Sequence, residues 1–335
     1  MTAASDFRAL EAANRRETAV LVAAMIAILA ALGFGLDVWS GSIRIADGSL
    51  SGFPLLTIFA LIFGGVQAVI SFYAGTRLVL LSVHALPLTP DTIQHQRVLD
   101  IINEMAIAAR MPTPRAYLMD DPAPNAFATG RDPAHSVICV TQGLVDTMDR
   151  EELQGVIGHE MSHIRDYDIR TMMMVAVMVG GIAMLSDFFF RMMFYSGGGG
   201  RRSSNDKNGG GGAILVIYLA TLILAAVAPI VAQLVAMAIS RQREYLADAS
   251  SVEFTRNPHA LLRALQQIAK SESPLKAATS GTGHLFIVNP REGVREDRER
   301  FFDNLLSTHP PLTKRIERLR AMLGASGQAT AVSQS

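Results

Sequence analysis

Two histidines and a glutamate within five consecutive residues could together bind a metal ion and activate water. The run His159-Glu160-Met161-Ser162-His163 is an H-E-x-x-H pattern. On an α-helix, positions i and i+4 lie on one face about 6 Å apart, so both imidazoles can reach one Zn²⁺. Glu160 borders that face and can hold a metal-bound water without ligating the metal, which is the position of a general base in metal-assisted hydrolysis.

The flanking residues predict a helix that carries this pattern. Asp149 is a suitable N-cap, and Glu152 three residues later completes a capping box. No proline interrupts the segment, and apolar residues recur at helical spacing: Leu153, Val156, Ile157 and Ile164. Gly155 and Gly158 lower the helix propensity, so we expect a neighbouring element to approach closely there. A chance match of the five-residue pattern is the alternative, and the apolar back face of the helix argues against it.

The composition indicates a membrane protein. Half of the 335 residues are hydrophobic and 18% are charged, against about a quarter in typical soluble domains. The 30 basic and 30 acidic residues balance, so nothing favours nucleic acid as a partner. The lone cysteine, Cys139, excludes a disulfide within the chain and a thiolate metal cluster, and its apolar neighbours predict a buried strand position.

Two apolar runs near the N-terminus are long enough to cross a bilayer. They predict an N-terminal membrane hairpin in residues 1–80, with spans at about 19–36 and 53–74. The first run is too long for the apolar core of a signal peptide and lacks a convincing cleavage site, so we expect it to be retained. Basic residues flank the two spans: Arg8, Arg15 and Arg16 precede the first, and Arg77 follows the second. They predict that both ends of the hairpin face the cytoplasm.

Residues 81–170 are predicted to form the first part of a cytoplasmic metal-binding domain, which includes the H-E-x-x-H helix. A helix opening at Pro90-Asp91 is predicted by an apolar stripe formed by Val98, Ile101, Ile102, Met105 and Ala109. Short strands are expected at Arg115–Met119, Asn125–Thr129 and Ser136–Thr141, separated by turns rich in proline and aspartate. These turn residues suit a small sheet with an accessible edge.

A second hydrophobic hairpin is predicted at residues 171–239. Its two apolar stretches flank a Gly-rich polar loop, residues 196–212, that is typical of a flexible segment. If the histidines share a metal with a residue beyond this hairpin, both of its ends lie on one side of the membrane. The chain then crosses twice or dips and returns, and the length of both stretches favours a full hairpin.

Residues 240–323 are predicted to form the second soluble part. An amphipathic helix is expected at 258–270, with Leu261, Leu262, Leu265 and Ile268 on its apolar face, and a charged helix at 291–305. A last helix is marked by Leu312, Ile316, Leu319 and Leu323. The small polar residues of the tail, 324–335, predict disorder.

Glu244 is the best candidate for a third metal ligand, because a catalytic zinc site uses three protein ligands and an open position. Asp248 lies one helical turn further on the same face and could accept the free N–H of a ligating histidine. An exposed, charged helix start is the alternative interpretation. Two like charges at this spacing repel unless a positive group lies between them, which favours the site.

At this point the sequence resembles a known family. H-E-M-S-H-I followed by R-E-Y-L-A-D resembles the HtpX family of membrane zinc metallopeptidases, which is related to the CAAX prenyl endopeptidases. Residues 125–130 resemble the edge strand beside the active site of that family. Thr308-His309-Pro310-Pro311-Leu312 with Arg315-Ile316 resembles its C-terminal motif.

The resemblance implies an α+β membrane protein. A mainly helical, zincin-like catalytic domain with a small edge-accessible β-sheet would accompany about four transmembrane or hydrophobic helices. One Zn²⁺ per chain would be bound by His159, His163 and Glu244, with Glu160 as the general base and Asp248 orienting a ligand. His309 would stabilise the oxyanion. The residues expected to pair with an extended peptide are Asn125, Ala126, Phe127, Ala128 and Thr129.

The function that follows is hydrolysis of unfolded or misfolded polypeptides, membrane proteins among them, by an endopeptidase in the lipid bilayer. The family points to the bacterial inner membrane, with the catalytic domain facing the cytoplasm, and to quality control under stress. The sequence predicts neither natural substrates nor oligomeric state.

Three other functions are weighed against this one. A metal transporter needs polar groups along its spans, and Asp187 is nearly the only acidic candidate. An inactive membrane scaffold has no need of Glu160. A prenyl-protein processing enzyme would share the chemistry, but so few spans seldom enclose a large intramembrane chamber.

Overall fold

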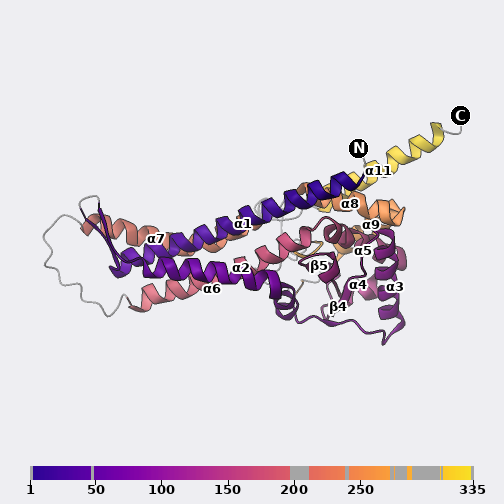
Figure 1. The fold of residues 1–335 in the computed structure, drawn as a ribbon. Coiled ribbons are helices and arrows are strands. Elements are labelled where there is room, and N and C mark those ends of the chain that lie inside the picture. The colour runs from indigo at the N-terminus through magenta and orange to yellow at the C-terminus, as the bar shows by residue number, and fades with distance from the viewer. Residues whose placement is uncertain are drawn as a thin grey trace.

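The structure, a computed structural model, describes residues 3–46, 49–196, 211–237, 241–271, 275, 285–288, 310 and 312–332. A long rod of helices forms one end of the molecule, and a body of shorter helices with a small sheet forms the other (Figure 1). Both termini lie near the body, so the long helices leave it and return to it.

Four long apolar helices form the rod: α1 (Ala3–Ser40), α2 (Leu55–Ser82), α6 (Asp168–Ser196) and α7 (Gly211–Met237). Three of them contain stretches long and apolar enough to cross a membrane, at Thr18–Ser40, Leu55–Ser82 and Asp168–Arg191. In the described part of α7 the apolar stretch is shorter, Leu219–Ala232. The prediction of about four hydrophobic helices is confirmed, and α2 runs eight residues beyond the predicted end of the second span.

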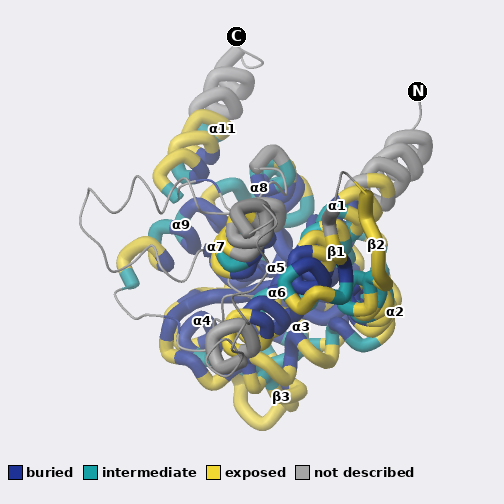
Figure 2. Tube along the Cα trace, turned by 90° about the vertical axis from the view of Figure 1, so that its left-hand side faces the viewer, coloured by how far each residue is buried: buried dark blue, intermediate teal, exposed yellow. Residues whose placement is uncertain are grey.

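The inner faces of these helices pack together, and their outer faces are apolar as well. Viewed along the rod, exposed positions cover the outer surface of α2 (Figure 2). Large exposed hydrophobic residues there include Phe59, Ile62 and Val69, with Ile223 and Ile230 on α7. Apolar surface on the outside as well as the inside is what lipid contact requires.

A β-hairpin joins α1 to α2. Its strands are β1 (Ile43–Ala46) and β2 (Ser49–Gly52), at the end of the rod far from the body (Figure 1). The buried carboxylate of Asp37 accepts hydrogen bonds from the backbone N–H groups of Leu56 (2.9 Å) and Thr57 (2.8 Å). Asp37 therefore caps the start of α2 from the neighbouring helix, because Pro54 provides no side-chain cap.

The body contains a sheet of four strands in the order β3-β4-β6-β5. Their bounds are β3 (Leu86–Pro87), β4 (Arg115–Met119), β5 (Ala126–Gly130) and β6 (Ser136–Thr141). β4 pairs with β6 in parallel and β5 pairs with β6 antiparallel, so β5 forms an edge. Two predicted strands have the observed bounds, and β5 lies one residue later than predicted. Cys139 is buried in β6 as expected, and burial raises the pKa of its thiol.

The remaining helices of the body pack against the sheet or against one another. They are η1 (Pro133–His135), α3 (Ile93–Ala108), α4 (Gln142–Thr147), α5 (Arg150–Arg165), α8 (Arg241–Thr255), α9 (Pro258–Lys270) and α11 (Leu312–Val332). The predicted apolar stripe of α3 is buried except at its end. Ala106 belongs to the core, whereas Ala109 is the half-buried C-cap, because the helix stops before the stripe would reach it.

Helix α5 begins as the sequence predicts. The Asp149 carboxylate accepts from the Glu152 N–H (2.8 Å), and the Glu152 carboxylate accepts from the Asp149 N–H (3.0 Å). A Cβ added at Gly155 would lie 2.5 Å from the backbone nitrogen of Leu261 in α9. The expectation of a close neighbour is confirmed there, since only glycine lets α9 pack so near.

The C-terminal part differs from the prediction in one respect. Helix α11 continues to Val332, so residues 324–332 are helical although their composition predicted disorder. This segment contains several alanines and no proline, and adding residues to an existing helix is much easier than starting one. The predicted helix at 291–305 and residues 197–210 of the Gly-rich loop lie outside the described residues.

Candidate metal centre

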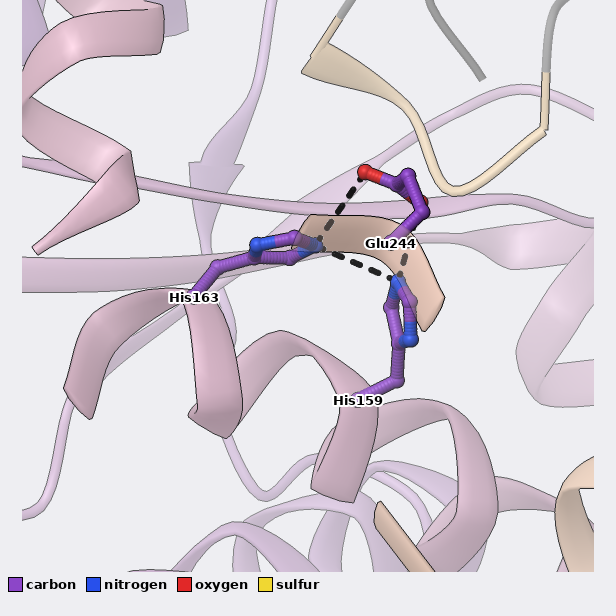
Figure 3. A group of neighbouring side chains, drawn as sticks. All are labelled: His159, His163 and Glu244. Carbon is purple, nitrogen blue, oxygen red and sulfur yellow. Dashed lines mark hydrogen bonds and ion pairs between the residues drawn. The ribbon is translucent and has the colours of Figure 1, made fainter. Parts of the chain in front are cut away.

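Helix α5 brings His159 and His163 together in the buried interior of the body. Their Nε2 atoms lie 3.3 Å apart, and the two rings are nearly perpendicular. Both side chains point toward the same place from successive turns of the helix (Figure 3). The i, i+4 spacing of the two histidines therefore brings both imidazoles to one place, as the sequence predicts.

Glu244 of α8 approaches the same place from the opposite side (Figure 3). Its Oε1 is 3.5 Å from Nε2 of His163, and its Oε2 is 3.6 Å from Nε2 of His159. In a tetrahedral site with bonds of about 2.0–2.1 Å, ligand atoms lie about 3.3 Å apart. Among the described residues, these three form a group that could hold a metal ion, and the spacing of their donor atoms fits one.

A carboxylate lies behind each histidine. Oδ1 of Asp248 is 3.0 Å from Nδ1 of His159, and Oδ2 of Asp168 is 3.1 Å from Nδ1 of His163. A carboxylate at Nδ1 holds the proton there and leaves the lone pair of Nε2 for a metal. Asp248 has the contact expected of it, whereas Asp168 is not among the residues that the sequence singled out.

Arg315 of α11 is a buried guanidinium beside the site. It donates from Nε to Oδ2 of Asp248 (3.0 Å) and from Nη2 to Oδ1 (2.6 Å). Its Nη1 donates to the carbonyl of Ile287 (2.8 Å) and lies 3.7 Å from Glu244. Arg315 therefore supplies the positive charge that lies between Glu244 and Asp248, the two acidic residues on one face of α8.

The charges shift the pKa values of the groups around the site. Burial alone would raise the pKa of Asp248, but Arg315 and His159 lower it below its usual value. Burial would lower the pKa of His163, but Asp168 and Glu244 raise it to about 9. The acidic residues thus dominate the field at the histidines, which suits a site for a cation.

Glu160 is buried on α5 next to His159, and its charge contributes to the raised pKa of both His163 and Arg315. It therefore lies within the same charged cluster as the three ligand candidates. A carboxylate there can take a proton from water held at the site.

The predicted edge strand contacts α5, but part of its outer edge is occupied. The N–H of Ile287 donates to the carbonyl of Ala126 (2.9 Å), and Nδ2 of Asn125 donates to the carbonyl of Val288 (3.0 Å). Phe286 packs edge-on against Phe127 with ring centroids 5.1 Å apart. All five residues proposed for peptide binding are buried, and their role stays a prediction.

The other histidines of the chain divide into two groups. His309, with the rest of residues 301–309, lies outside the described residues, and so does His284. His84, His95, His135 and His259 are described, and none belongs to the metal-binding group.

Two parts of the site had recognisable signals that the sequence reading did not use. Asp168 is an acidic residue at the start of an apolar helix, five residues after His163. Arg243 directly precedes Glu244 and pairs with Asp168 (3.1 Å). The segment Leu285–Val288 carries no comparable polar signal, and its place beside β5 depends on the tertiary fold.

Comparison with known proteins bears directly on this site. The model of peptidase family M48 matches residues 92–323, a range that contains all of the described ligand candidates and their carboxylate partners. A protease HtpX homolog from Caldanaerobacter subterraneus subsp. tengcongensis is 42% identical over 313 residues, covering 93% of this chain and 97% of its own. One from Dictyoglomus thermophilum is 38% identical over 323 residues, covering 94% of each chain.

A third protease HtpX homolog, from Streptococcus uberis, is 39% identical and covers 93% of this chain and 98% of its own. Among solved structures, Ste24p from S. mikatae matches with a TM-score of 0.47 and 20% identity. That match covers 80% of this chain and 58% of Ste24p.

Proposed function

The chain belongs to peptidase family M48 and is a multi-pass membrane metalloprotease, and on this premise we propose that it is a zinc endopeptidase acting on unfolded membrane proteins. The observation that carries the proposal is the convergence of His159, His163 and Glu244 on one point beside Glu160.

The donor set supports zinc among the divalent ions. Two imidazole nitrogens and one carboxylate, with a fourth position for water, form a usual catalytic zinc site. The 3.3 Å between the two Nε2 atoms fits the tetrahedral spacing, and each Nε2 has one oxygen of Glu244 at 3.5 or 3.6 Å. Bound Zn²⁺ supplies Lewis-acid polarisation of a carbonyl and acidifies water, so that hydrolysis can proceed near neutral pH.

Glu160 acts as the general base in this proposal. It takes a proton from the attacking water and passes it to the leaving amine, which is the role of a buried carboxylate that ligates nothing itself. His309, as the resemblance implies, would donate to the oxyanion that forms on the substrate carbonyl. Asp248 and Asp168 hold the two imidazoles with Nε2 directed inward.

The substrate would add a strand to the outer edge of β5. In an antiparallel pair, alternate residues direct their peptide groups away from the partner strand. Because Asn125 bonds to Thr141 of β6, Ala126, Ala128 and Gly130 direct theirs outward. The carbonyl of Ala126 already accepts from Ile287, so Ala128 and Gly130 are the places for a peptide backbone. Main-chain recognition of this kind selects extended, unfolded segments over particular side chains.

The proposed location is the bacterial inner membrane, with the body in the cytoplasm. Arg8, Arg15 and Arg16 lie in the part of α1 before its apolar stretch, and Arg77 lies near the end of α2, which is the pattern of cytoplasmic segments. The two soluble parts, residues 81–170 and 240–323, would form one protease domain into which the hairpin 171–239 is inserted. His163 and Glu244 flank that hairpin in sequence and meet in space, so we propose that it crosses the membrane and returns.

The test is cleavage of an unfolded soluble protein by the detergent-purified full chain, with and without a zinc chelator. Glu160→Gln should lower the rate by at least about 100-fold at unchanged zinc content, because the residue is a base and not a ligand. Glu151→Gln, an exposed change on the same helix, is the matched control and should keep full activity. Equal rates for wild type and Glu160→Gln would contradict the proposal.

A further inference from the structure

Asp168 is the first residue of α6, and its carboxylate bridges two elements that approach the metal centre. Oδ2 lies 3.1 Å from Nδ1 of His163, and Oδ1 accepts from Nη1 of Arg243 at 3.1 Å. We propose that Asp168 is a positioning residue for His163, and that Arg243 holds Asp168 in place. The inference rests on the proposed function, because it takes His163 to be a metal ligand.

The contact between Asp168 and Nδ1 of His163 determines whether Nε2 of the same ring has a free lone pair for a metal ion. A neutral imidazole carries one proton, and a carboxylate at Nδ1 keeps that proton on the side away from the metal. In this structure Nε2 of His163 is 3.3 Å from Nε2 of His159 and 3.5 Å from Oε1 of Glu244. Asp168 thus fixes both the tautomer of His163 and the direction of its lone pair.

The carboxylate has a counter-charge suited to its position. Asp168 is buried, and a buried carboxylate is costly unless it is paired and hydrogen-bonded. Arg243 supplies the positive charge, and its side chain is 13% exposed. Both oxygens of Asp168 therefore have directed partners, so a turn of the side chain would lose one of them.

The position of the pair in the chain gives it a second consequence. Asp168 begins α6, and Arg243 lies in the first turn of α8, just beyond the hairpin formed by α6 and α7. Arg243 also directly precedes the ligand candidate Glu244. The ion pair therefore joins the two ends of the hydrophobic hairpin and connects them to two of the three metal ligands. The separation of these ends sets the geometry of the site.

A purely structural ion pair between α6 and α8 would stabilise the fold without acting on the metal. The two roles differ in what they change. Loss of a structural pair lowers stability and leaves the intrinsic metal affinity of the folded chain unaltered. Loss of a partner at Nδ1 weakens metal binding and alters the ligand field, whatever happens to stability.

The experiment compares Asp168→Asn with Asp166→Asn in the full chain purified in detergent. Asp166 is also buried and lies two residues away, but its carboxylate accepts from Nε of Arg165 and from the hydroxyl of Ser162. The measurements are the Zn²⁺ dissociation constant by competition with a chelator, the absorption spectrum of the Co²⁺-loaded protein, and the unfolding temperature. Asp168→Asn should weaken Zn²⁺ binding about 10- to 100-fold and change the Co²⁺ spectrum. Asp166→Asn should change neither.

Arg243→Lys is the second variant and keeps the positive charge. Arg243→Lys should weaken Zn²⁺ binding less than Asp168→Asn does. If Asp168→Asn does not fold, Arg243→Lys tests the proposal in its place. A Zn²⁺ dissociation constant and Co²⁺ spectrum equal to wild type in these variants, with only the unfolding temperature lowered, would overturn the proposal. A wild-type chain that binds no Zn²⁺ would overturn the proposed zinc site itself, which is a separate result.

Discussion

The two histidines of the metal centre have similar surroundings built from different parts of the molecule. Each imidazole has an aspartate at Nδ1, and each aspartate has an arginine. Asp248 and Arg315, which serve His159, come from α8 and α11 of the body. Asp168 and Arg243, which serve His163, lie at the two ends of the hydrophobic hairpin.

The two arrangements differ in how tightly they are held. Arg315 is fully buried and binds Asp248 through two nitrogens, at 2.6 and 3.0 Å. Nη1 of Arg243 donates to Oδ1 of Asp168 at 3.1 Å, and the other oxygen, Oδ2, faces His163. A paired fork of hydrogen bonds fixes orientation better than a single one. We infer that the half of the site within the body is the rigid half, and that the half at the hairpin can respond to the membrane helices.

The largest expected effect comes from Arg315→Met. It leaves the Asp248 carboxylate buried without its cation, and breaking such a pair costs about 3–5 kcal/mol of folding free energy. The measurement is chemical denaturation in detergent, followed by circular dichroism. Arg243→Met is the matched change in the other half and should cost about 1.5–3 kcal/mol, because one charged hydrogen bond is lost. A larger loss of folding free energy in Arg243→Met than in Arg315→Met would contradict the inference that the half of the site within the body is the more rigid one.

A smaller effect is expected from changes at the two glycines of α5. Gly155→Ala would place a methyl group 2.5 Å from the Leu261 backbone nitrogen and force α5 away from α9. Overpacking of this kind costs about 1–3 kcal/mol.

Gly158→Ala is the control for that change. Its nearest neighbour would be the Ser251 hydroxyl at 3.1 Å, a side-chain contact longer than the 2.5 Å backbone contact at Gly155. Alanine also has the higher helix propensity by about 1 kcal/mol, so the net change should be small. The two variants are compared by their unfolding temperatures. Equal destabilisation would mean that α9 does not set the position of α5.

The smallest effect concerns pH. Burial raises the pKa of Asp166 above its usual value, so the folded chain binds this proton more tightly than the unfolded chain does. The ionised form of Asp166 is therefore disfavoured in the fold, and its contribution to stability falls as pH rises from the usual pKa through the raised one. Asp166→Asn removes this pH-dependent contribution to the stability of the fold.

The variant and the wild type should therefore have equal unfolding temperatures below both pKa values, with the variant slightly more stable at neutral pH. A series of melts from about pH 3 to about pH 8 tests this. A difference that grows as the pH falls would contradict it.

Local signals in the sequence predicted most of the site. The spacing of His159 and His163, the capping box at Asp149, and the i, i+4 relation of Glu244 and Asp248 each follow from helix geometry, and all of them appear in the structure. The apolar runs likewise predicted the helices of the rod, because length and composition alone show that a helix could cross a bilayer.

Two of the missed features depend on tertiary contacts between distant segments. Arg315 reaches Asp248 across 67 positions, and no periodicity marks the pairing. Ile287 occupies an edge of β5 that the sequence predicted to be accessible, through a backbone hydrogen bond that carries no side-chain signature. Asp168 was missed because it begins an apolar helix and reads as the boundary of a span.

The central claim is that a residue beyond the hydrophobic hairpin completes the metal site. The most direct test is the zinc content of the purified chain after equilibrium dialysis, measured for wild type, Glu244→Gln and Glu253→Gln. Glu253 is an exposed glutamate of the same helix, with a side chain that is 74% exposed, and its change is the control. The account predicts one zinc per chain in wild type and Glu253→Gln and a large loss in Glu244→Gln. Full zinc occupancy in Glu244→Gln, with its affinity unchanged, would contradict the account.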